Sequence, residues 1–151
     1  MLRFVLVLTC AGLSSCASVL FPQSPQEMLS SSTRSQDYCY PDSPAVVTER
    51  VKSYLESCYT PRTSTMMIPA AGVMVAAPRK MDWRVVSEPS GEGTQLSVAL
   101  QHGFVLSAVI KPASGSCASG MRVYGGTPFW EDRFPHIDAA ARGGQAVCKA
   151  L

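Results

Sequence analysis

The sequence predicts an α+β domain in which an antiparallel sheet of about four to five strands carries helices on one face and is held by two disulfides. Three observations support this fold class. Apolar residues recur at helical spacing after Pro44, they alternate at strand spacing across much of residues 81–124, and a second helical pattern follows Thr127. The order helix, antiparallel strands, helix is typical of a sheet covered by helices on one face.

The first helix is expected to begin at Pro44 and to run for about 14 residues. Asp42 or Ser43 supplies the capping side chain, and proline suits the first helical position. Pro61 ends the helix. The apolar stripe that should face the core consists of Val47, Val51, Tyr54, Leu55 and Cys58.

Residues 63–77 carry no charge and form two β-prone halves that are divided at residues 69–72. The segments Met66-Met67-Ile68 and Val73-Met74-Val75 allow two interpretations. They form a core or edge strand, or they form a methionine-rich surface that adapts to a partner. The following stretch, residues 81–88, alternates apolar and polar residues and predicts a strand that ends in a turn at residues 89–93.

Residues 94–111 predict a hairpin, and its register depends on the loop. A three-residue loop at Gln101-His102-Gly103 collects the larger apolar side chains on one face better than a two-residue loop at His102-Gly103 does. It also places Gly103 where a left-handed residue belongs. The pairs expected from this register are Leu100 with Phe104, Val98 with Leu106, Leu96 with Ala108, and Thr94 with Ile110.

The last third of the chain predicts a short strand at residues 122–124 and then helical segments. Thr127 and Pro128 begin a helical turn. Pro135 starts a second helix, which ends at Gly143-Gly144. Its apolar side consists of Ile137, Ala140 and Ala141.

Four cysteines lie in the expected domain: Cys39, Cys58, Cys117 and Cys148. An even number of cysteines predicts disulfides if the chain is exported, which the N-terminal segment described next indicates. Zinc binding is disfavoured because there is no Cys-x-x-Cys pair and no histidine at ligand spacing. Four cysteines allow three pairings. We favour Cys39 with Cys58 and Cys117 with Cys148, because each pair closes a local loop.

The N-terminus carries one positive charge at Arg3 and then the apolar run Phe4 to Gly12, which is too short to span a bilayer. Leu13-Ser14-Ser15-Cys16 follows, and this segment resembles the lipobox of bacterial lipoproteins. The resemblance implies that residues 1–15 are removed as a signal peptide and that Cys16 is acylated. The alternative is an ordinary signal peptide cut at Ala11 or Ala17, and Cys10 is a weaker candidate for the lipidated residue.

The predicted organisation is therefore a signal peptide (1–15), a lipidated flexible tether (16–36) rich in serine, glutamine and proline, and one domain (37–151). The tether should hold the domain at the periplasmic face of the outer membrane, because no aspartate follows Cys16. That inference comes from the same resemblance, which covers only about the first 18 residues. The membrane is thus a partner through the N-terminal lipid.

No candidate catalytic or metal site is strong. His102 is expected at an exposed loop tip, and His136 with Asp138 is expected on a first helical turn. The stretch from Ser114 to Gly120 does not match the Gly-x-Ser-x-Gly pattern, and Cys117 is better explained as a disulfide partner. The formal net charge of +2 comes from scattered residues, which disfavours nucleic acid as a partner. We expect no cofactor, no metal and no catalytic residues.

An aromatic group near the C-terminus is a candidate partner-binding surface or, alternatively, a set of residues that packs the C-terminal helices onto the sheet. It consists of Tyr124, Phe129, Trp130, Arg133 and Phe134. The sequence thus favours a non-enzymatic binding or accessory protein for an envelope partner, most simply another envelope protein. The alternatives are an immunity or inhibitor lipoprotein against a toxin or cell-wall hydrolase, and a small periplasmic hydrolase.

Overall fold

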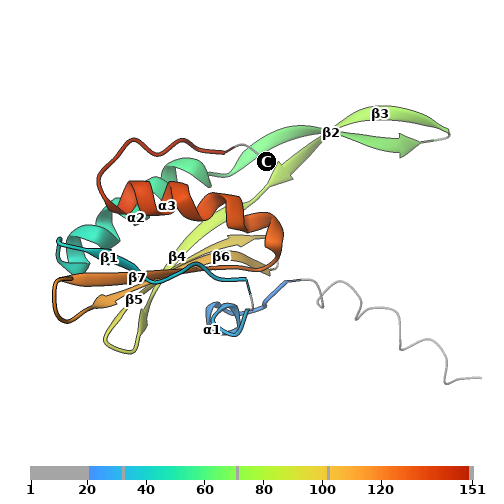
Figure 1. Cartoon of the computed structure of the whole chain (residues 1–151). Helices are drawn as coiled ribbons and strands as arrows, with labels where there is room; N and C mark the ends of the chain where they lie inside the picture. Colours follow the sequence, from blue (N-terminus) through green and yellow to red (C-terminus); the bar gives the residue numbers. More distant parts are fainter. Residues whose placement is uncertain (1–20, 32, 71, 102, 150–151) are drawn as a thin grey trace, which may run out of the picture.

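A five-stranded antiparallel sheet with strand order β1-β7-β6-β5-β4 forms the centre of the domain (Figure 1). The computed structural model describes residues 21–31, 33–70, 72–101 and 103–149. The strands of the sheet are β1 (Tyr38–Tyr40), β4 (Trp83–Ser90), β5 (Gly93–Leu100), β6 (Gly103–Pro112) and β7 (Ser119–Gly125). Two further strands, β2 (Arg62–Ala70) and β3 (Val73–Met81), pair only with each other. The predicted α+β class is confirmed.

The long helices cover one face of this sheet. They are α2 (Pro44–Cys58) and α3 (Phe134–Ala141), and the 3₁₀ helix η1 (Pro128–Arg133) leads into α3. The predicted stripe of α2 is buried at Val47, Val51, Tyr54 and Leu55. These side chains pack with Leu96, Val98, Ile110 and Ile137 in one hydrophobic core. Both predicted helices are therefore found close to their expected positions.

The other face of the sheet is covered by the N-terminal segment. Helix α1 (Pro25–Met28) buries Met28 completely, and Gln95 of β5 donates a hydrogen bond of 2.6 Å to the carbonyl of Pro25. Gln95 also bonds Ser107, which in turn bonds Ser97. The described part of the expected flexible tether, residues 21–31 and 33–36, is thus packed onto the sheet, and the folded region begins before Asp37. The physical reason is that the side chains of β5 and β6 on this face, including Gln95, are shielded from water only if another segment packs on them and supplies hydrogen bonds.

The hairpin of β5 and β6 has the predicted register over most of its length. Val98 pairs with Leu106, Leu96 with Ala108, and Thr94 with Ile110. Near the turn the prediction is wrong: a bulge between Val98 and Ala99 shifts the pairing, so that Ala99 faces Phe104 and Leu100 faces Gly103. The residue with positive φ is Gln101, at 55°, and not Gly103. His102 lies outside the described residues.

Two disulfides are present, but their pairing differs from the expected one. The bonds join Cys39 to Cys117 and Cys58 to Cys148, with Cα–Cα distances of 5.4 and 5.3 Å. Local loop closure was the wrong criterion because strand pairing decides the neighbours: β1 lies beside β7, so Cys39 pairs with Gly120 and lies near Cys117. Each bond closes a long loop, which in the chain-entropy model stabilises the fold by about 4 to 5 kcal/mol.

Candidate functional site

The aromatic group near the C-terminus is mostly interior. Trp130, Arg133 and Phe134 are 4%, 3% and 6% exposed, so they offer almost no surface to a partner. Trp130 packs against Tyr59 and Trp83 in the core. Phe129 remains exposed and Tyr124 is half-buried. The structure therefore does not bring the five predicted residues together as one binding surface, and packing of the C-terminal helices accounts for three of them.

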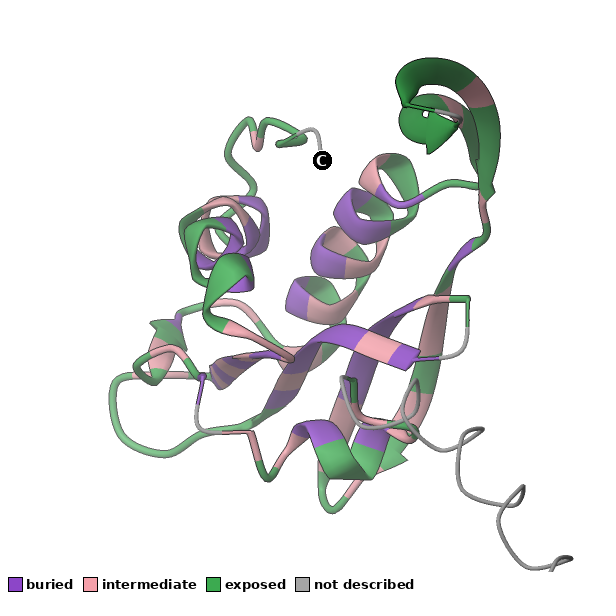
Figure 2. Ribbon diagram, turned by 90° about the vertical axis from the view of Figure 1, so that its right-hand side faces the viewer, coloured by how far each residue is buried: buried purple, intermediate pink, exposed green. Residues whose placement is uncertain are grey.

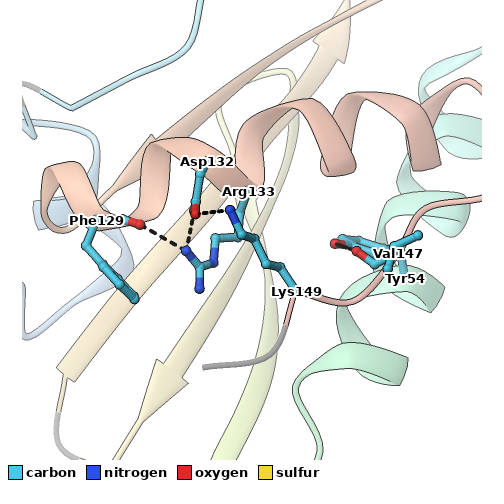
Figure 3. Close-up of polar contacts among 6 residues, drawn as sticks. All are labelled: Tyr54, Phe129, Asp132, Arg133, Val147 and Lys149. Atoms are coloured by element: carbon cyan, nitrogen blue, oxygen red, sulfur yellow. Dashed lines mark hydrogen bonds and ion pairs between the residues drawn. The ribbon is translucent and has the colours of Figure 1, made fainter.

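Asp132 connects η1 to the C-terminal segment, and Arg133 lies between Asp132 and Phe129 (Figure 3). The guanidinium of Arg133 donates to the carbonyl of Phe129 at 3.1 Å, pairs with Asp132, and lies 4.6 Å from the centre of the Phe129 ring. Asp132 also binds Lys149, and this hydrogen bond lowers the pKa of Asp132 below its usual value. These contacts hold the end of the chain against the helices, together with the Cys58–Cys148 bond.

His136 and Asp138 do not form a dyad. Asp138 accepts a hydrogen bond of 2.8 Å from the hydroxyl of Tyr40 and pairs with Arg142. Burial of Tyr40, followed by this contact with a carboxylate, raises the pKa of Tyr40 well above its usual value. Asp138 therefore has two structural partners: Tyr40, which links β1 to α3, and Arg142 at the end of α3.

The remaining candidate residues are also accounted for by structure. Cys117 is bonded to Cys39 and carries no free thiol. Within the described residues, no group of three or more His, Cys, Asp or Glu side chains is placed to hold a metal ion. In the same part of the chain, no helix has the length and apolar character needed to cross a membrane. Cys16 lies outside the described residues.

The most distinctive surface is the antiparallel ribbon of β2 and β3, which we call the arm. It projects away from the body of the domain, and nearly all of it is exposed (Figures 1 and 2). The exposed fractions are 56% for Met67, 62% for Val73 and 58% for Met74. The other large apolar side chains exposed on the arm are Met66, Ile68 and Val75. A contiguous exposed apolar patch of this kind is typical of an interaction site.

The base of the arm adjoins a shallow hollow in the body. This hollow is lined by Pro61, Asp82, Trp83, Arg84 and Gln101. The side chain of Trp83 is 1% exposed, and its indole nitrogen has no hydrogen-bond partner among the described residues. Gln101, in the turn between β5 and β6, donates its backbone N–H to the carbonyl of Asp82 at 3.3 Å. The arm is thus attached at the end of the sheet where that turn lies.

Sequence reasoning identified the two strands of the arm but not their exposure. The available signal was the absence of charge over residues 63–78, together with Pro69 and Pro78. Within a sheet, proline is largely confined to edge strands, so two prolines three and six residues from the turn at Gly72 are incompatible with two central strands. Of the two interpretations of the methionine-rich segments, the surface interpretation agrees with the exposed fractions, and the core interpretation does not.

Comparisons with protein-family models, with curated proteins and with solved structures return no match to this chain.

Proposed function

We propose that this protein is a lipid-anchored, non-enzymatic accessory protein of the bacterial envelope, held by Cys16 at the periplasmic face of the outer membrane. The lipobox-like segment ending at Cys16 supports the anchor. The two disulfides support a location outside the cytoplasm, where such bonds persist. The carboxylate of Asp138 and the sulfur of Cys117, which are candidate catalytic groups, are both engaged in structural contacts.

The observation that carries the proposal is the exposed arm. Its apolar side chains project from both strands at positions where the body of the domain does not cover them. Met66, Met67 and Met74 are flexible and polarisable, and such side chains adapt to the shape of a binding partner. The arm is therefore the proposed contact between this protein and another component of the envelope.

Site-specific photo-crosslinking in the native cells tests this function. A photoreactive residue replaces Met67 or Met74 on the arm and, as a control, Val46, which is 41% exposed on α2. Mass spectrometry then identifies the adducts and the modification of Cys16. A reproducible adduct from the arm positions, absent at Val46, together with acylated Cys16, is the expected result. Equal background labelling at all three positions would refute the binding role of the arm.

A further inference from the structure

Both faces of the arm are apolar at its outer end. Directly paired residues of an antiparallel ribbon share a face, so the two faces can be read from the register. One face carries the pairs Met66–Ala77, Ile68–Val75 and Ala70–Val73. The other carries Met67–Ala76 and Pro69–Met74. A flat protein surface would cover only one of these faces, whereas a medium that surrounds the ribbon would cover both.

The edges of the arm are poorly suited to pairing with another strand. Pro69 pairs with Met74, and Pro78 pairs with Thr65 four positions along the ladder. Since proline has no N–H, both pairs fit the non-hydrogen-bonded positions, whose N–H groups point outward from the ribbon. Each outer edge therefore lacks one backbone N–H donor, and this lack disfavours the addition of a further strand to that edge. The faces of the arm, and not its edges, are the surfaces available for binding.

The base of the arm is cationic. Arg62, Arg79 and Lys80 follow directly on either side of the uncharged stretch, and the arm contains no acidic residue. Lys80 pairs with Asp82 at 3.2 Å beyond the end of β3, while the guanidinium of Arg79 contacts the sulfur of Met66 at 3.5 Å. Within the described residues, Arg62 and Arg79 form no ion pair. An apolar end with a cationic base is the chemistry that binds an anionic lipid surface.

The N-terminal end of the described chain lies at the same end of the sheet as the arm (Figure 1). The carbonyl of Pro22 accepts a 2.8 Å bond from Phe104, and a Cβ atom on Gly103 would lie 2.7 Å from Phe21. Gly103 begins β6 directly after the turn whose Gln101 contacts Asp82 at the base of the arm. Since residues 21–31 are packed onto the domain, only five peptide steps separate Cys16 from Phe21. These steps span at most about 18 Å.

We propose that the arm inserts its apolar end into the interfacial layer of the membrane that holds Cys16, with Arg62, Arg79 and Lys80 on anionic headgroups. This inference rests on the proposed function, because lipidated Cys16 keeps this end of the sheet near the membrane. The insertion is shallow, since the unpaired edges of a two-stranded ribbon are not tolerated in the hydrocarbon core but can bind water and headgroups in the interface. Lipid anchor and arm then fix the orientation of the domain.

The test uses the full-length mature protein, whose lipidation on Cys16 is first verified by mass spectrometry. The protein is reconstituted into vesicles of phosphatidylethanolamine and phosphatidylglycerol that contain brominated lipid, which quenches nearby tryptophan. In the wild type, Trp83 and Trp130 are buried and serve as the internal baseline. Met74→Trp places a tryptophan on the arm, and Val46→Trp is the matched control, because Val46 lies at the end of α2 farthest from the arm.

The expected result is strong quenching in Met74→Trp, with Val46→Trp at the wild-type baseline. Arg79→Gln with Lys80→Gln, placed in the Met74→Trp background, should lower the ratio of inserted to free arms by about fivefold for each charge removed. Absence of quenching in lipidated Met74→Trp would overturn the inference but leave the proposed function intact. The same holds if a protein partner or a second copy of this chain covers the arm and shields the tryptophan from lipid. An unlipidated Cys16 would overturn both proposals.

Discussion

The hairpin of β5 and β6 and the arm of β2 and β3 are both long antiparallel pairs rich in apolar residues, yet their environments are opposite. Residues Gln95 to Ala99 of β5 are buried on both faces, whereas the strands of the arm are exposed on both faces. The difference comes from the neighbours: α2 and α3 cover one face of the first hairpin, and α1 covers part of the other. An apolar strand therefore becomes core only where another element is available to cover it.

The largest expected difference between the body and the arm concerns the disulfides. Cys39→Ser with Cys117→Ser removes a bond that closes a loop across most of the domain. It should lower the free energy of unfolding by about 2 to 5 kcal/mol in urea titrations. Met67→Ser with Met74→Ser, the control pair on the arm, should change it by less than about 0.5 kcal/mol. Equal effects of the two pairs would show that the arm contributes to the fold as much as the body does.

A matched pair of isoleucines sharpens the comparison. Ile110 in β6 is fully buried, whereas Ile68 in β2 is 45% exposed. Ile110→Ala should lower the free energy of unfolding by about 2 to 5 kcal/mol, because it removes buried methyl groups and leaves a cavity. Ile68→Ala should change that free energy by no more than about 0.5 kcal/mol. A loss above 2 kcal/mol for Ile68→Ala would mean that the arm packs against the body.

Alkaline pH should lower the stability of the body through its tyrosines, since all five tyrosines of the chain lie outside the arm. Burial raises the pKa of Tyr59 to about 12, from an unfolded value near 10. The folded state thus holds the phenolic proton longer than the unfolded state does. The contribution of Tyr59 to the free energy of unfolding is therefore fully present below about pH 10. This free energy falls by roughly 2 to 3 kcal/mol as the pH rises from 10 to 12.

Urea titrations between pH 8 and pH 12 measure this loss. Tyr59→Phe removes the titrating group, so its free energy of unfolding should fall less steeply above pH 10 than that of the wild type. Tyr40, whose pKa is also raised by burial, continues to titrate in both proteins. Parallel curves for the wild type and Tyr59→Phe would show that Tyr59 does not cause the loss.

The sequence was sufficient for features that depend on local pattern. The stripe from Val47 to Leu55 predicted α2, and the alternation across β5 and β6 predicted three of the four pairs that we expected. Features that depend on contacts distant in sequence were not predicted. Cys39 meets Cys117 only because β1 pairs with β7 across 78 residues. Similarly, α1 covers Gln95, but this helix has only four residues, which are too few to show a periodic hydrophobic pattern in the sequence.

The same limitation explains the candidate site. Trp130, Arg133 and Phe134 have the composition of a binding surface, but the hydrophobic core also needs large side chains, and the sequence does not indicate which use prevails. The apolar strands of the arm present the opposite case. Their composition suits a core, and only the three-dimensional arrangement shows that no helix of the described residues covers them.

Amide hydrogen exchange of the lipidated protein, in detergent solution and in anionic lipid bilayers, tests the contrast between the two hairpins most directly. Residues 62–81 should exchange rapidly in detergent and more slowly in the bilayer, whereas β5 and β6 should exchange slowly in both states. Protection of the arm equal to that of β5 in detergent, or an unchanged arm in the bilayer, would contradict this expectation.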